Sequence, residues 1–240
     1  MNIKSFDKQI LYYLINFDYV NLIKLYLPEE FEQLDQIVAN DSFFNGLNNL
    51  VITSNLLNLN KYIFPNTVTI CSSVKKMSKF AFLDCSGIRN VFFECPSSIS
   101  QIGPSSFLEC QYLFQISIPP SVTQIGNTCF LKCKHLVHVY IPSSVTYIGK
   151  SAFRGCSSLD KISIPPLIKK IDEETFSGCS SLTQVIFESP SSLASIEYCA
   201  FKDCTSLTQI SIPSSLTRFG NSVFIGCSSL KQILIPSSVT

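Results

Sequence analysis

The sequence predicts a repeat solenoid, mainly β, with short parallel strands and a small α-helical N-terminal cap. Three observations lead to this fold class. A phenylalanine recurs every 23 or 25 residues, a cysteine and then a leucine or isoleucine follow it at intervals of three, and an alternating apolar pair comes next. Such a fixed period is typical of architectures in which each repeat packs only against its neighbours.

Residues 1–65 have no repeat columns, and we expect them to form a helical N-terminal capping region. Asp18 suits the start of a helix running to Leu27, and Pro28 suits the first turn of another. The terminal repeats of a solenoid need a cap, so this region is expected to cover the first coil. The residues that fit one face of a first helix are Ile10, Leu11, Leu14 and Ile15.

Residues 66–240 are expected to form the solenoid, with about seven coils of 23–25 residues. The recurring phenylalanines are Phe82, Phe107, Phe130, Phe153, Phe176, Phe201 and Phe224. The cysteines of the second column are Cys85, Cys110, Cys133, Cys156, Cys179, Cys204 and Cys227. No coil can bury these columns alone, so successive coils should stack the phenylalanine rings into an internal ladder.

The alternating apolar pair of each coil, such as Val139 and Ile141, predicts a strand with one buried face. In five coils the strand runs into a proline, which lacks a backbone donor and ends ladder pairing. Two longer coils contain "ECPSSIS" and "ESPSSLAS", interpreted as turn insertions that keep the strand register. The five prolines are Pro119, Pro142, Pro165, Pro213 and Pro236.

The phrase Phe-x-x-Cys-x-x-Leu-x-x-Ile-x-Ile-Pro-x-x-Val-x-x-Ile-Gly resembles the leucine-rich repeat of BspA-type surface proteins, which occur in oral bacteria, treponemes and the protist Trichomonas. The resemblance covers about residues 66–240. It implies a curved solenoid of the leucine-rich-repeat type. In family members it also implies location at the cell surface and attachment to host proteins or other cells.

Charge and hydropathy exclude several functions. Lys and Arg total 18 against 17 Asp and Glu, so no field of one sign would attract nucleic acid or an acidic membrane surface. No apolar run reaches the roughly 18 residues of a membrane span. The first 20 residues lack the apolar core of a signal peptide, which at face value predicts a cytoplasmic protein.

No catalytic or cofactor-binding residues are expected, and the chain is predicted to be non-enzymatic. It has two histidines and neither a Gly-x-Ser-x-Gly motif nor a glycine-rich phosphate loop. The column cysteines are expected to be buried, reduced packing residues. The recurrent Ser-Ser pairs are expected to be turn formers that bond to their own backbone.

Four potential metal ligands lie within ten residues: Cys129, Cys133, His135 and His138. Their types suit zinc. However, Cys133 belongs to the buried column, whereas His138 alternates with Val139 and Ile141 and should point out of the opposite face of the strand. No metal site is therefore predicted, and the histidines are expected to face solvent.

The outward residues of the strands are the candidate partner-binding face, because a solenoid presents them side by side on one sheet. Tyr140, flanked by His138 and Lys161, is the expected anchor, since aromatic and cationic groups favour binding hot spots. An ordinary solvated sheet face is the alternative. The face comprises Asn90, Phe92, Gln115, Ser117, His138, Tyr140, Lys161, Ser163, Gln184, Ile186, Gln209, Ser211, Gln232 and Leu234.

Two functions are consistent with these features. The first is a leucine-rich-repeat protein that binds a host or cell-surface protein, like the surface antigens that it resembles. The second is an intracellular scaffold or adaptor, whose segment "LPEEFEQLDQIV" weakly resembles the start of an F-box. The sequence stops mid-phrase at "IPSSVT", and we expect truncation there because proteins normally cover an open strand edge.

Overall fold

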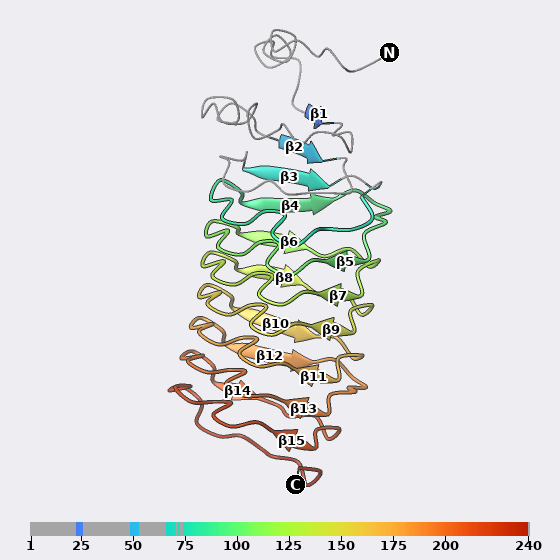
Figure 1. The fold of residues 1–240 in the computed structure, drawn as a ribbon. Coiled ribbons are helices and arrows are strands. Elements are labelled where there is room, and N and C mark those ends of the chain that lie inside the picture. The colour runs from blue at the N-terminus through green and yellow to red at the C-terminus, as the bar shows by residue number, and fades with distance from the viewer. Residues whose placement is uncertain (1–22, 26–48, 53–65, 71, 73, 240) are drawn as a thin grey trace, which may run out of the picture.

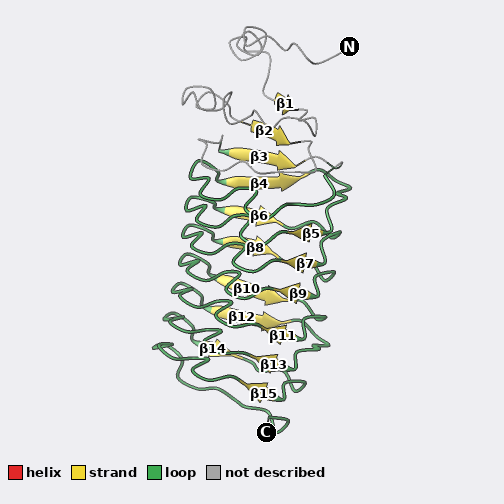
Figure 2. Cartoon of the chain, in the orientation of Figure 1, coloured by secondary structure: helices red, strands yellow, loops and turns green. Residues whose placement is uncertain are grey.

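The computed structural model of the 240-residue chain describes residues 23–25, 49–52, 66–70, 72 and 74–239. The described residues form a rod of stacked coils, as predicted (Figure 1). All regular elements among them are strands, and turns connect these strands (Figure 2).

The first six of the seven strands that the alternating apolar pairs predicted form parallel sheets, in the order β1-β2-β3-β4-β6-β8 followed by β10-β12-β14. The seventh, at Ile233 and Ile235, is wrong as a strand, because only an isolated bridge joins Ser211 to Leu234 at the last coil. Val91 pairs with Ile116 and Val185 with Ile210, so both 25-residue steps keep the register as expected. We refer to the ladder of these strands as the first sheet. Its strands in the repeats are β3 (Thr67–Ile70), β4 (Asn90–Phe93), β6 (Gln115–Ser117), β8 (His138–Tyr140), β10 (Lys161–Ile164), β12 (Gln184–Phe187) and β14 (Gln209–Ile210).

A second parallel ladder, which the sequence did not predict, lies on another side of the rod (Figure 1). Each of its strands has two residues, and the second residue is the apolar one that precedes a glycine or acidic residue. Its order is β5-β7-β9 followed by β11-β13-β15. The strands are β5 (Gln101–Ile102), β7 (Gln124–Ile125), β9 (Tyr147–Ile148), β11 (Lys170–Ile171), β13 (Ser195–Ile196) and β15 (Arg218–Phe219).

Two strands lie within the region expected to be a helical cap, β1 (Ile23–Leu25) and β2 (Asn49–Ile52). They continue the first sheet, with Leu50 in register with Val68. The helical prediction is therefore wrong at residues 23–25, which a helix running to Leu27 would include. Backbone pairing with β2, which itself pairs with β3, favours a strand at residues 23–25 over the helix that the local sequence pattern predicts. The remainder of the predicted cap lies outside the described residues.

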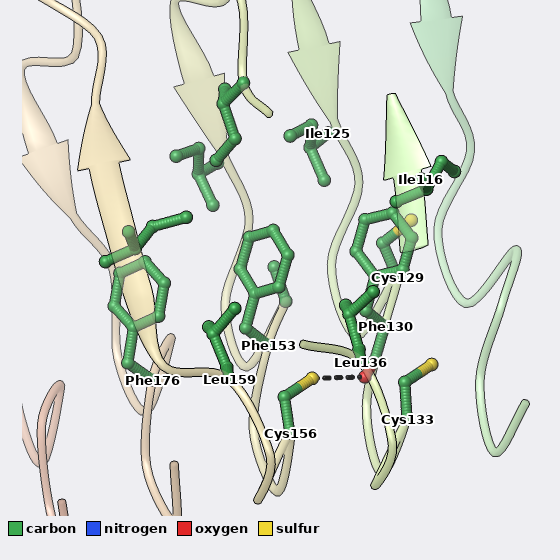
Figure 3. Packing of buried hydrophobic residues seen from close by; sticks show 14 of the residues in the cluster. Ile116, Ile125, Cys129, Phe130, Cys133, Leu136, Phe153, Cys156, Leu159 and Phe176 are labelled. Atoms are coloured by element: carbon green, nitrogen blue, oxygen red, sulfur yellow. Dashed lines mark hydrogen bonds between the residues drawn. The ribbon is translucent and has the colours of Figure 1, made fainter. Parts of the chain in front are cut away.

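The buried phenylalanines form the internal ladder that the repeat predicted. Their rings lie nearly parallel, with centroids 5.0–5.7 Å apart and interplanar angles of 4–13°. This offset stacking is a favoured geometry for aromatic pairs. Figure 3 shows three of these rings, Phe130, Phe153 and Phe176, with the neighbouring leucine and cysteine columns. From Phe82 to Phe201 the rings have no exposed surface, and Phe224 is half-buried.

The chain around each phenylalanine is an arch with two left-handed residues, one two positions before the ring and one two positions after it. Around Phe153 these are Ser151 (φ 54°) and Gly155 (φ 72°). The arch directs the amide of Phe153 towards the next coil, where it donates to the carbonyl of Thr175 at 2.9 Å. The same bond recurs in each coil from Phe82 to Phe201, so the arches form a third main-chain ladder.

Some serines of the proline turns act differently from the expectation. The turns form as predicted, with the amide of Val145 donating to the carbonyl of Pro142. However, the hydroxyl of Ser144 donates to the carbonyl of Val122 in the preceding coil, and Ser215 does the same to Leu193. These two hydroxyls link neighbouring coils, because the adjacent carbonyl is within reach along the rod. In the two longer coils the expectation is confirmed, since Ser97 accepts from the amide of Ile99 and Ser191 from that of Leu193.

We predict that Phe153→Ala lowers the free energy of unfolding by about 3–5 kcal/mol, because the ring is fully buried and stacked on both sides. Urea unfolding would measure the change. Tyr140→Ala is the control, because Tyr140 is 63% exposed and its truncation should change stability by about 0.5 kcal/mol or less. Equal losses in the two variants would contradict a continuous buried ladder.

Candidate partner-binding surface

The first sheet holds the predicted partner-binding residues on its outer face. Asn90, Gln115 and His138 pair in register across β4, β6 and β8, and Lys161, Gln184 and Gln209 pair across β10, β12 and β14. The half-buried members of the face are Asn90, Gln115, Ser163 and Gln184. The exposed members are Phe92, Ser117, His138, Tyr140, Lys161, Ile186, Gln209, Ser211, Gln232 and Leu234.

The predicted central anchor lies where the first sheet is interrupted. No pairing joins β8 to β10 among the described strands, and the second ladder is interrupted between β9 and β11 in the same coils. The phenylalanine ladder continues across this point, because Phe130 and Phe153 stack at 5.1 Å. Tyr140 and His138 therefore stand on one side of the interruption, and Lys161 stands on the other.

A stack of three planar side chains lies beside this face, and the sequence prediction missed it. The guanidinium of Arg89 lies 5.9 Å from the ring centroid of Tyr112, and that ring stacks on His135 with centroids 5.1 Å apart. We call Arg89, Tyr112 and His135 the planar stack. Phe114, which is also exposed and lies two residues after Tyr112, meets His138 of the predicted face edge-on with centroids 6.0 Å apart.

The imidazole of His135 is held in one tautomer. Its Nδ1 lies 2.8 Å from the carbonyl oxygen of Gln111, and a carbonyl can only accept, so Nδ1 carries the proton. In the neutral ring Nε2 then has a free lone pair. In later coils the equivalent carbonyl accepts from the hydroxyl one position earlier in the repeat, as Ser157 does from Ser180 and Ser180 does from Thr205.

A comparison of the repeat columns within the sequence could have revealed the planar stack. Tyr112 and His135 are each the second residue after a column cysteine. Later coils carry Ser158, Ser181, Ser206 and Ser229 at that position. The large side chains are therefore a local departure from the repeat. The prediction considered only residues alternating within the strands, and these two precede them.

The zinc-type cluster is divided between the interior and the surface of the rod. Cys129 and Cys133 are buried, and the thiol of Cys133 donates to the carbonyl of Phe107 at 3.0 Å. His135 and His138 are exposed, as predicted. Among the described residues, no group of three or more His, Cys, Asp or Glu side chains could hold a metal ion.

The column cysteines have a structural role beyond packing. The thiol of Cys156 donates to the carbonyl of Phe130 at 3.1 Å (Figure 3). Five more column cysteines, from Cys110 to Cys227, make the same bond to the phenylalanine of the preceding coil. These bonds satisfy carbonyls buried between coils. Burial raises the pKa of the Cys156 thiol well above its usual range, so this group is an inert thiol and not a nucleophile.

The side of the rod formed by the arches and the second ladder is charged, and it holds five ion pairs. Lys132 contacts Glu109 at 2.6 Å, Arg154 contacts Glu174 at 2.8 Å, and Lys170 contacts Asp172 at 3.1 Å. Lys150–Glu173 and Arg218–Glu197 are further pairs. A shallow groove here has Gly155 and Gly178 among its lining residues, together with both partners of the Arg154–Glu174 pair.

Parallel two- to four-residue strands, closed into coils around phenylalanine, cysteine and leucine columns, define a leucine-rich-repeat solenoid. The chain belongs to the family described as BspA type leucine-rich repeat region, which matches residues 36–160 and 146–240. No curated protein matches the sequence. Within the described residues, no helix has the length and apolar character needed to span a membrane.

Several solved structures resemble this one. A leucine-rich repeat protein of T. pallidum (TpLRR) has 24% identity and a TM-score of 0.54, over 77% of this chain and 78% of that chain. One from Bacteroides ovatus has 24% identity and a TM-score of 0.39, over 80% and 65%. The pneumococcal vaccine antigen PcpA has 20% identity and a TM-score of 0.39, over 74% and 63%. The similarity to the T. pallidum protein confirms the fold.

The buried thiols predict a loss of stability in alkaline solution. The unfolded chain releases thiol protons at about pH 8.5, whereas burial raises the pKa of Cys179 in the folded chain to about 12. Above about pH 8.5 the folded state binds more protons than the unfolded state, so the free energy of unfolding falls as pH rises. Each such thiol should contribute a slope of up to about 1.4 kcal/mol per pH unit.

Urea unfolding from neutral to alkaline pH would measure this slope in the parent chain and in Cys179→Ala. At neutral pH, the difference in the free energy of unfolding between the parent and the variant gives the loss of packing alone. We expect the variant to lose less further stability than the parent as pH rises. An identical pH dependence would show that the thiol does not stay protonated in the folded state.

Proposed function

We propose that this chain is a non-enzymatic binding protein that captures a protein partner on the outer face of the first sheet. The observation that carries the proposal is the contrast between columns. The buried columns repeat phenylalanine, cysteine and leucine, whereas the outward position changes to His138 and Lys161 in the middle coils and is glutamine again from Gln184 onward. The distinctive side chains therefore gather on the middle coils, where a solenoid presents them side by side to a partner.

Family membership supports the kind of partner and the location that we propose. Leucine-rich-repeat domains typically mediate protein interactions, and repeats of this kind are generally non-catalytic scaffolds. BspA-type proteins suggest a surface location. The partner would then be a host or cell-surface protein, bound by a chain exposed on its own cell.

The middle coils supply the anchor in this proposal. Tyr140 is the most exposed aromatic side chain among the described residues, and His138 and Lys161 flank it. Aromatic and cationic side chains dominate binding hot spots because they combine large contact area with directional contacts. The interruption between β8 and β10 adjoins these three side chains.

We predict that Tyr140→Ala combined with Lys161→Ala weakens attachment of the purified protein to cells by about tenfold or more, because it removes the anchor. Thermal unfolding should change little, since both side chains are exposed. Attachment should also fall when the target cells are first treated with trypsin, because the partner is a protein. Unchanged attachment of the double variant would exclude the central anchor.

Labelling intact producing cells with a reagent that cannot cross membranes tests the location. The surface proposal predicts that the protein is labelled together with known surface proteins. A protein labelled only after lysis would contradict it and support the intracellular scaffold or adaptor.

A further inference from the structure

We propose that the planar stack and Phe114 form the docking site for a segment of the partner that carries both carboxylate and aromatic side chains. The inference rests on the proposed function, since it takes the partner to be a protein. It adds the chemistry of the bound segment and a further contact in the coils of residues 82–140, beside the central anchor.

The geometry of the planar stack determines which groups it offers. Because Tyr112 is sandwiched between Arg89 and His135, both faces of its ring are occupied. The exposed parts are the edges of the planes, which carry the N–H groups of Arg89 and the hydroxyl of Tyr112. A guanidinium stacked on an aromatic face keeps its in-plane donors free for bidentate bonds to a carboxylate. Because only the edges of these planes can contact a ligand, the planar stack favours an acidic ligand, which accepts hydrogen bonds from the edges. A sugar would need an open ring face to pack against.

The charges around the planar stack are complementary to such a ligand. Arg89, Lys134 and Lys161 are exposed, and among the described residues none of the three has a carboxylate partner. Asp160 is adjacent to Lys161 in the sequence, and it already accepts a hydrogen bond from the hydroxyl of Thr183. On the other side of the rod, by contrast, five cations have carboxylate partners. The cations near the planar stack are therefore free to bind a carboxylate from outside the described part of the chain.

Phe114 supplies the apolar part of the site. Its side chain is 44% exposed although it lies next to a buried column residue, Leu113, and only the edge of His138 contacts its ring among the aromatic side chains described. Exposed aromatic surface next to free cationic donors suits an aromatic side chain that is flanked by acidic residues. Tyrosine and tryptophan are the residues most enriched at such contacts.

The fold does not require these residues. The position of Tyr112 is serine in the last four coils, and the position of Phe114 is threonine at Thr183 and Thr208. The later coils stack at the same spacing without the larger side chains. The large side chains therefore add nothing that the repeat needs, and their exchange should leave the solenoid intact.

The test uses defined probes and the whole chain. Fluorescence anisotropy would measure binding of a labelled random copolymer of glutamate and tyrosine, beside polyglutamate, a lysine–tyrosine copolymer and heparin. The variants are Tyr112→Ser and Phe114→Thr, each of which installs a residue that this chain uses at the same position. Leu167→Ser is the matched control, because Leu167 is 49% exposed but lies in the turn after β10, outside the predicted face and away from the planar stack.

We expect the glutamate–tyrosine copolymer to bind more tightly than polyglutamate, and the lysine–tyrosine copolymer not to bind. Each of Tyr112→Ser and Phe114→Thr should weaken binding by about tenfold, and Leu167→Ser should not. Arg89→Lys should also weaken binding, because lysine keeps the charge but loses the planar fork. Circular dichroism should be the same for all variants.

Three results would overturn the inference: no binding of the glutamate–tyrosine copolymer, equal binding by the Tyr112→Ser and Phe114→Thr variants, or equally tight binding of heparin. The last would indicate a general polyanion site. None of these results decides the proposed function, which the Tyr140→Ala and Lys161→Ala attachment assay tests separately. If that variant loses attachment while Tyr112→Ser keeps it, the partner binds at the central anchor and not at the planar stack.

Discussion

Each coil of this rod is stable only because the coils on either side cover it, and the stacked phenylalanine rings are the clearest form of that dependence. Phe153 contacts Phe130 and Phe176, and no part of its ring reaches solvent. The same constraint fixes the other buried columns, because identical spacing along the rod demands similar side chains at each level. It also determines how the outward side chains align, because strands whose buried side chains are in register have their exposed side chains in register as well.

Main-chain hydrogen bonding explains why the columns contain these particular residues. The amide of each buried phenylalanine donates to the next coil, and its carbonyl accepts both an amide of its own coil and a thiol from the next. Cysteine can donate the thiol hydrogen bond to this carbonyl, because it carries a weak donor and its side chain is small enough to fit within the arch. The left-handed residues on either side of the ring cost conformational energy, which glycine avoids at Gly155, Gly178 and Gly226.

The columns, the strand register across the longer coils and the outward face followed from the sequence, because apolar periodicity directly encodes burial. The second ladder did not, because a strand such as Gln124–Ile125 is too short to show a period. The arches were also hidden: Glu109 and Lys132 look like ordinary surface residues, and only their backbone angles show their role. The planar stack was missed because Tyr112 and His135 precede the strands, although a comparison of columns would have marked both as departures from serine.

Amide hydrogen exchange at the arches tests the account most directly, because the arch ladder and the stacked rings must form together. The account predicts that the amides of Phe107, Phe130, Phe153 and Phe176 are as strongly protected as those of the first sheet, although they lie outside any strand. Rapid exchange at these four amides, with protection confined to the strands, would show that the coils are joined only by the sheets. That result would contradict the conclusion that the buried phenylalanine ladder holds neighbouring coils together.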